Sequence, residues 1–135
     1  MAPNVLMKDS YEEINTIKSI IKVLLKNLNT KGTLSEEEIE NIGETIIPTL
    51  WLEYRHQWYK DNPYKNQEKR YVTNIKTNKR MRSILRNNPE HREAIKDILP
   101  KDLKIIINPG EVVLILWNVK QRYQLYPKWE YPLGK

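Results

Sequence analysis

The stretch Leu99–Val119, LPKDLKIIINPGEVVLILWNV, provides the strongest signal for the fold of this chain. It holds two dense apolar runs, Leu103–Ile107 and Val112–Trp117, separated by a Pro109-Gly110 pair. Ile and Val are stiff at χ1 and pack well on a pleated surface, so each run predicts a β-strand. Neither run alternates cleanly with polar residues, which favours strands buried on both faces. Because a type II turn fits a two-residue hairpin poorly, we expect a slightly longer or bulged connection between the strands.

Length and composition indicate the class of protein. A chain of 135 residues is long enough for one domain with its own core. It has no cysteine, so neither a disulfide nor a thiolate metal site is expected. No apolar run approaches the roughly 18 residues of a membrane span, and the N-terminus has no apolar signal segment. We therefore expect an intracellular protein with no membrane partner.

The formal charge of +6 is concentrated in one window. Between Lys60 and Arg86 there are nine Lys and Arg residues against Asp61 and Glu68, whereas the rest of the chain is nearly neutral. Such a basic stretch can face nucleic acid or an acidic protein, although a lysine-rich composition can also scatter cations without a function. The candidate nucleic-acid-binding residues are Lys65, Lys69, Arg70, Lys76, Lys79, Arg80, Arg82 and Arg86.

The first third of the chain predicts two helices. Ser10 and Glu13 have the spacing of a capping box, and an apolar stripe follows at Ile14, Ile17, Ile21, Leu24 and Leu28. Ser35 and Glu38 have the same spacing before a second stripe over residues 39–54. Pro48 lies inside that stripe, and we expect a kink there because the apolar pattern continues beyond it. A short loop between two amphipathic helices predicts an antiparallel helical hairpin.

The remaining segments complete an α+β fold. We expect short strands at 71–76 and 121–126, and short helices at 80–86 and 89–99. The prediction is a helical bundle of about four or five helices packed on a small antiparallel sheet of about four strands. The domain is expected to span residues 10–127, between a flexible N-terminus at 1–9 and a C-terminal extension at 128–135.

The sequence carries little catalytic chemistry. Its two histidines, His56 and His91, are far apart, and no zinc-protease, serine-hydrolase or calcium-loop motif is present. The acidic residues at 36–40 are better explained as partners of the helix dipole than as an acid–base pair. We therefore expect a protein that is not an enzyme and uses no metal or cofactor.

Three stretches in register resemble the BTG/Tob, or anti-proliferative (APRO), domain family. Tyr54–Lys65, YRHQWYKDNPYK, is similar to the family's first box, Y-K-H-H-W-F-P-E-x-P-x-K-G. Leu99–Val112, LPKDLKIIINPGEV, is similar to the second box, L-P-x-[DE]-L-[ST]-[LIV]-W-[IV]-D-P-x-E-V. Leu25–Ser35, LKNLNTKGTLS, is similar to the segment between the family's first helices. Order and spacing agree over about residues 10–126.

The resemblance implies an APRO-like fold and a non-catalytic adaptor. Such adaptors dock on the Caf-type deadenylase subunit of the CCR–NOT complex, promote shortening of mRNA poly(A) tails, act as co-regulators of transcription and restrain proliferation. It also implies a cytoplasmic and nuclear location. The protein-binding residues that it implies are His56, Trp58, Pro63, Lys65, Arg70, Ile106, Asn108, Pro109 and Glu111.

The departures from the family pattern leave alternatives open. The second-box Trp, expected at the deadenylase interface, is Ile106 here, and the box's Asp is Asn108. Losing an interface Trp typically costs about 2 kcal/mol or more, roughly a thirtyfold drop in affinity. One alternative is the same fold repurposed to bind RNA through the basic face over 65–86. Another is a self-associating or host-mimicking module, for which the sequence assigns no oligomeric state.

Overall fold

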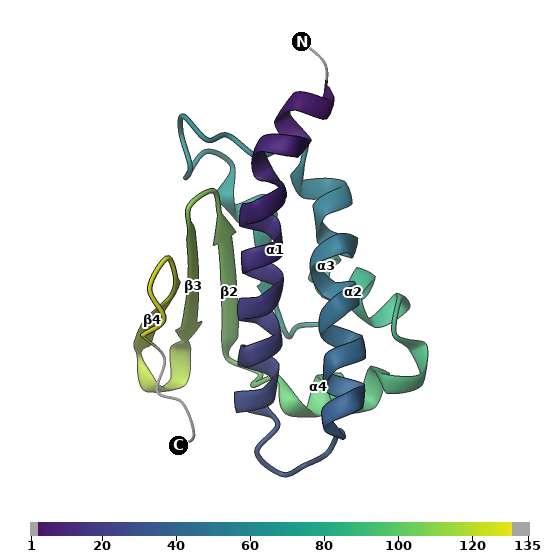
Figure 1. The fold of residues 1–135 in the computed structure, drawn as a ribbon. Helices are drawn as coiled ribbons and strands as arrows, with labels where there is room; N and C mark the ends of the chain where they lie inside the picture. Colours follow the sequence, from purple (N-terminus) through teal and green to yellow (C-terminus); the bar gives the residue numbers. More distant parts are fainter. Residues whose placement is uncertain (1–2, 131–135) are drawn as a thin grey trace.

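A computed structural model describes residues 3–130, with side chains described from residue 11 onward. Within that range the chain forms four α-helices and one four-stranded antiparallel sheet, as the sequence predicted. In Figure 1 the helices gather on one side of the sheet. The elements are α1 (Pro3–Leu28), α2 (Glu36–Tyr54), β1 (Tyr71–Thr73), α3 (Lys79–Arg86), α4 (Arg92–Ile98), β2 (Leu103–Asn108), β3 (Glu111–Leu116) and β4 (Gln121–Tyr126), with 3-10 turns at Gln67–Arg70, Pro89–His91 and Trp117–Val119.

The helical hairpin of α1 and α2 forms much as expected. The capping box is complete, because Ser35 Oγ accepts from the Glu38 amide at 3.1 Å and the Ser35 amide donates to Glu38 Oε1 at 2.8 Å. Helix α2 continues past Pro48 to Tyr54, which confirms that this proline does not end it. The predicted start of α1 at Ser10 is wrong: the helix begins at Pro3, since proline suits a first helical position and no breaker follows. Residues 1–2 and 131–135 of the two predicted terminal segments lie outside the described part.

The sheet has the order β1-β2-β3-β4, with each neighbouring pair antiparallel. Asn108 pairs with Glu111, so Pro109 and Gly110 alone join β2 to β3. The expected longer connection is therefore wrong. Gly110 has φ +79°, and a proline before such a glycine matches a type II turn.

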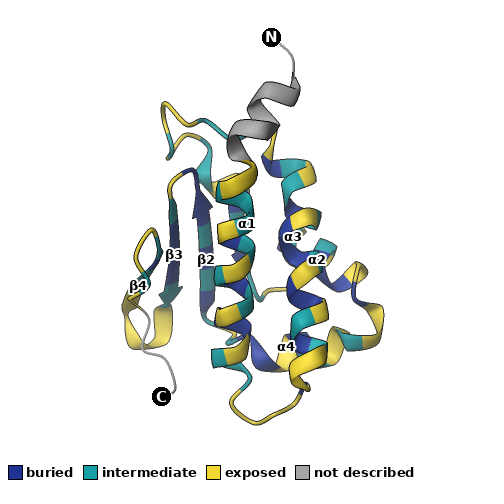
Figure 2. Cartoon of the chain, viewed as in Figure 1, coloured by how far each residue is buried: buried dark blue, intermediate teal, exposed yellow. Residues whose placement is uncertain are grey.

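The core lies between the helices and one face of the sheet. Buried residues from α1, α2, α3 and α4 form one cluster with Leu103, Ile105 and Ile107 of β2. Figure 2 shows this buried band along β2 and β3 and along the sides of α1 and α2. Alternate residues Lys104 and Ile106 are only half-buried, so the prediction that β2 is buried on both faces is wrong. No helix in the described range is long and apolar enough to cross a membrane.

Candidate docking site

Arg70 joins the loop after α2 to the end of β2. It ends the short turn before β1, and its side chain is completely buried. Its guanidinium points at carbonyl oxygens from both segments rather than at solvent. The acceptors are Gln57 O (2.6 Å), Pro63 O (2.8 Å), Lys65 O (3.2 Å), Ile107 O (2.8 Å) and Asn108 Oδ1 (2.8 Å).

The electrostatic surroundings of Arg70 are dipolar. No carboxylate of the described residues forms an ion pair with it. Backbone and amide oxygens accept its hydrogen bonds, and its Cζ lies 6.0 Å from the centre of the Trp58 ring. Burial lowers the pKa of Arg70 from its usual value. Tyr54 O–H donates to the Arg70 carbonyl at 2.8 Å, and burial raises the pKa of that phenol. The planar guanidinium of Arg70 has five N–H groups in fixed directions, which matches the arrangement of these oxygen acceptors.

Asn108 completes the junction. Its Oδ1 accepts from Arg70, and its Nδ2 donates to Gln67 Oε1 at 3.0 Å. The loop over residues 55–69, which we call the aromatic elbow, is therefore held against the β2–β3 turn. In Figure 1 the elbow and this turn lie at one end of the molecule, opposite the α1–α2 loop. The two boxes, more than thirty residues apart in sequence, meet in space through these bonds.

Three of the residues predicted to contact a partner are buried instead. Arg70, Asn108 and Pro109 are buried, and the side chains of Arg70 and Asn108 form hydrogen bonds inside the junction. The physical reason is that an arginine inside a loop can satisfy several carbonyls that no backbone N–H reaches. For Arg70 this also corrects its assignment as a nucleic-acid-binding residue.

The other predicted residues remain at the surface around this junction. His56 and Lys65 are exposed, while Trp58, Pro63, Ile106 and Glu111 are half-buried. The Trp58 ring meets Trp51 edge-on, with centroids 5.3 Å apart. The indole N–H of Trp58 is buried and has no hydrogen-bond partner among the described residues.

Comparisons with known proteins agree with this arrangement. A family model described as "BTG family" matches residues 11–126, which includes both boxes and the Arg70 junction. The chain belongs to the BTG family. This BTG domain is 23% identical over 103 residues to the protein BTG1 of Gallus gallus, covering 73% of this chain and 59% of that protein. It is 24% identical to BTG1 of Homo sapiens, covering 73% and 58%.

A solved structure shows the same fold. A variant of the FOG-3 BTG/Tob domain from C. elegans superposes with a TM-score of 0.64 at 16% identity, covering 87% of this chain and 91% of that one. The predicted α+β, APRO-like architecture is thus confirmed. This BTG domain spans less than two thirds of the length of the BTG1 proteins that it matches.

The outer face of the sheet carries an aromatic feature that sequence analysis missed. Lys104 Nζ lies 4.4 Å from the centre of the Tyr71 ring and 5.1 Å from that of Trp117. Trp117 itself is 55% exposed. The sequence did contain a signal for this feature. Lys104 interrupts the apolar run of β2, and because side chains alternate along a strand it indicates which face of β2 is exposed to solvent.

The basic residues of the window do not share one environment. Lys65, Lys69, Lys76, Lys79, Arg82 and Arg86 are exposed. Arg80 is half-buried and donates to Tyr71 O at 2.9 Å and to Glu68 O at 3.3 Å. The window therefore mixes exposed cations with structural ones, and exposed Lys65 lies 4.7 Å from the centre of the Tyr59 ring.

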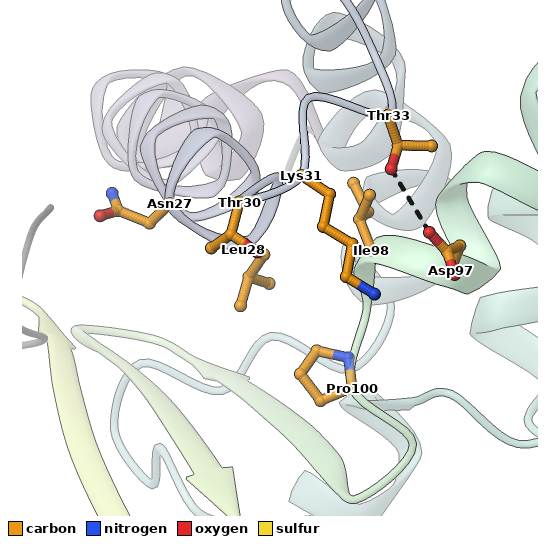
Figure 3. A pocket seen from close by; sticks show the side chains of 8 residues that line it. All are labelled: Asn27, Leu28, Thr30, Lys31, Thr33, Asp97, Ile98 and Pro100. Atoms are coloured by element: carbon orange, nitrogen blue, oxygen red, sulfur yellow. Dashed lines mark hydrogen bonds between the residues drawn. The ribbon is translucent and has the colours of Figure 1, made fainter. Parts of the chain in front are cut away.

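The described part of the domain contains no cluster of His, Cys, Asp or Glu side chains able to hold a metal ion. His56 is exposed, and His91 Nδ1 lies 3.7 Å from Glu38. A pocket of about 270 Å³ beside the α1–α2 loop has one cation and one carboxylate in its lining, Lys31 and Asp97 (Figure 3). Asp97 already accepts a hydrogen bond from Thr33 at 3.4 Å.

Proposed function

We propose that this BTG domain is a non-catalytic adaptor that recruits a Caf-type deadenylase subunit of the CCR–NOT complex. Recruitment promotes shortening of mRNA poly(A) tails and so regulates transcription and proliferation, in the cytoplasm and the nucleus. The observation that supports this proposal is the Arg70 junction, which holds the elbow and the β2–β3 turn as one surface. A rigid surface loses little entropy on binding, which is what an adaptor needs.

The contacts proposed for the deadenylase are the surface residues around the junction. His56, Trp58, Lys65, Ile106 and Glu111 carry exposed or half-buried side chains there. Trp58 is a half-buried aromatic of the kind that anchors interfaces. Glu111 lies 3.9 Å from the exposed Arg122, a weak pair whose cation a partner's cation can replace.

The position of Ile106 gives a gain-of-function test. Ile106 is half-buried on the outer face of β2, between Tyr71 of β1 and Val113 of β3. The resemblance places an interface Trp at this position, so Ile106→Trp is expected to raise affinity for a purified Caf-type deadenylase about thirtyfold. Isothermal titration calorimetry measures the change in dissociation constant.

Matched variants make that test specific. Ile115→Trp, on the outer face of the neighbouring strand β3, is the control for added aromatic surface and is expected to change affinity little. Lys65→Glu is expected to weaken binding, whereas Lys31→Glu, at the opposite end of the molecule, is not. If neither the parent chain nor Ile106→Trp binds at micromolar concentration, the recruitment proposal is wrong.

RNA binding is the second candidate, supported by the six exposed cations at 65, 69, 76, 79, 82 and 86. Such binding weakens steeply with salt, with a slope of about 0.7 log units per log salt for each phosphate contacted in a single strand. Fluorescence anisotropy with an oligoadenylate at several salt concentrations tests it. An affinity for oligoadenylate that does not change with salt concentration contradicts RNA binding and leaves the deadenylase proposal unaffected.

A further inference from the structure

A groove of about 900 Å³ lies away from the Arg70 junction, between the β1–α3 connection, α3, α4 and the α4–β2 connection. Its apolar lining includes Met81 and Leu85 from α3 and Leu99 after α4, all three buried. Ile75 also lines it and is 54% exposed, which is unusual for an isoleucine in a folded domain. The volume is in the range of sites that hold a ligand or several peptide side chains.

The walls of this groove are fixed by hydrogen bonds. Asn74 Nδ2 donates to Lys96 O at 3.1 Å and to Leu99 O at 2.6 Å, which ties the β1–α3 connection to the end of α4. Asn78 caps α3, its Oδ1 accepting from the Met81 amide at 2.8 Å, and its Nδ2 donates to Tyr71 O at 3.2 Å. A groove formed in advance loses little free energy to ordering when a ligand enters.

The charged residues around the groove are mostly unpaired cations. Five basic side chains line it against only two carboxylates, Glu93 and Asp97. Glu93 lies 3.8 Å from Lys96, and Asp97 accepts from Thr33. The other basic residues form no ion pair within the described part of the chain, and they are Lys76, Arg82, Arg92 and Lys101.

We propose that this groove binds an acidic peptide segment of a partner protein. An aliphatic side chain of the peptide enters the lining beside Ile75 and Met81, and the flanking Asp and Glu side chains pair with Arg82 and Arg92. Methionine and leucine linings adapt to aliphatic side chains of different shapes. The cations supply electrostatic attraction and set the sign of the partner's charge.

The groove chemistry favours a peptide over a nucleic acid. The lining includes no aromatic side chain, so bases have no ring on which to stack. Its two carboxylates would also repel phosphates, whereas a peptide can place a backbone or basic group near them. The aliphatic lining matches the apolar side chains of an acidic-apolar peptide, and the cations at its edge match the peptide's carboxylates.

The location of the groove separates it from the proposed deadenylase site. Leu99 and Lys101 precede the first residue of β2, whereas Asn108 at the other end of β2 belongs to the Arg70 junction. Five residue steps along a strand span roughly 17 Å. Two partners can therefore bind at the same time, one at each end of the strand. This proposal goes beyond the proposed function and does not depend on deadenylase binding.

Nuclear magnetic resonance titration of the full 135-residue chain tests the proposal. The probe is a synthetic peptide in which Asp and Glu alternate with Leu, compared with one in which every Leu is replaced by Ser. We expect saturable amide shifts confined to residues 74–85 and 92–101 with the first peptide and a much weaker response with the second. Arg82→Glu is expected to lower the affinity about tenfold, because it places a like charge against the peptide.

Two matched controls locate the binding. Arg86→Glu changes an exposed arginine one turn along α3 that does not line the groove, and it should leave affinity unchanged. Ile75→Ser should weaken binding. Val119→Ser should not, because Val119 is 57% exposed but does not line the groove.

The following outcomes overturn the proposal. They are an absence of saturable shifts at millimolar peptide, shifts centred outside the groove, or equal losses for Arg82→Glu and Arg86→Glu. Tighter binding of an oligoadenylate than of the acidic peptide to the same residues would identify a nucleic-acid site instead. Concentration-dependent shifts at the groove without peptide, with a dimer in sedimentation, would identify a contact between two copies.

Discussion

Arg70 and Arg82 lie twelve residues apart in the same basic window, yet they do opposite things in the folded domain. Arg70 is completely buried and donates five hydrogen bonds to oxygens of the elbow and β2. Arg82 is exposed on α3, lines the groove and forms no ion pair within the described residues. The first arginine joins the elbow to the end of β2, and the second is exposed to solvent.

This contrast shows that the number of basic residues in a window does not tell which of them are buried and which are exposed. A guanidinium becomes structural when the chain around it offers several carbonyl oxygens and no competing water. The elbow over residues 55–69 provides them because its irregular backbone leaves carbonyls without partners in a helix or a sheet. On α3 the carbonyls are already engaged along the helix, so Arg82 has only solvent and prospective ligands.

Arg70→Met should have the largest effect, because it keeps much of the side-chain volume while removing all five hydrogen bonds. Leaving buried oxygens unpaired and detaching the elbow should lower the free energy of unfolding by about 3–5 kcal/mol. Urea denaturation measures it. Arg82→Met is the matched control and should change stability by no more than about 0.5 kcal/mol. Similar losses for the two variants would remove the distinction between the two arginines.

Much of the fold was predictable from local signals. The Ser35–Glu38 capping box, the apolar stripes of α1 and α2 and the two runs around Pro109-Gly110 each placed an element correctly. These signals work because caps, periodicity and turn residues act over only a few positions. The start of α1 was missed because two adequate start signals, at Pro3 and Ser10, compete, and propensity alone does not rank them.

The candidate site was predictable only in part. The two boxes identified the elbow and the turn, but the burial of Arg70 depends on carbonyls contributed by Gln57, Pro63 and Ile107. Those contacts are made across the fold, so no spacing in the sequence reports them. The groove was missed for the same reason, since Ile75, Arg82 and Arg92 come from three segments.

Asn108→Asp supplies the buried Arg70 with a carboxylate, which Arg82 on the surface lacks. The new carboxylate replaces the Oδ1 that accepts from Arg70 at 2.8 Å, and the Gln67 amide can turn to donate to it. We expect unfolding free energy to rise by about 1 kcal/mol through charge-assisted hydrogen bonds. The arginine should hold the pKa of the carboxyl below the unfolded value of about 3.9. The gain should therefore be present at neutral pH and be lost as pH falls through the folded pKa.

Asn88→Asp is the control, and its effect should have the opposite sign. Asn88 is also buried, but its Nδ2 donates to Ile84 O at 2.9 Å, and no cation forms an ion pair or hydrogen bond with it in the described structure. A carboxylate there faces a carbonyl oxygen, so stability should fall by about 2 kcal/mol at neutral pH. Thermal unfolding between pH 3 and pH 7 measures both variants. Destabilisation by both would mean that Arg70 gains nothing from a full countercharge.

Lys22→Met tests the smallest effect, at an ionic cluster that is held by solvent-facing pairs rather than by burial. Lys22 Nζ contacts Glu44 and lies 2.8 Å from Glu40, and these hydrogen bonds lower the pKa values of both carboxyls from the usual value of a glutamate. A lowered pKa stabilises the folded state above the unfolded pKa, and this contribution disappears as pH falls through the folded pKa.

The variant should consequently lose less stability than the parent chain when pH is lowered from 6 to 3, and added salt should reduce the difference. Lys31→Met is the control, because Lys31 is exposed and forms no ion pair in the described part of the chain. Urea midpoints across this pH range give the measurement. If Lys22→Met and Lys31→Met have the same acid profile as the parent, the ion pairs of Lys22 contribute nothing to stability. The Lys22 pairs would then differ in kind from the buried hydrogen bonds of Arg70, whose removal should cost several kcal/mol.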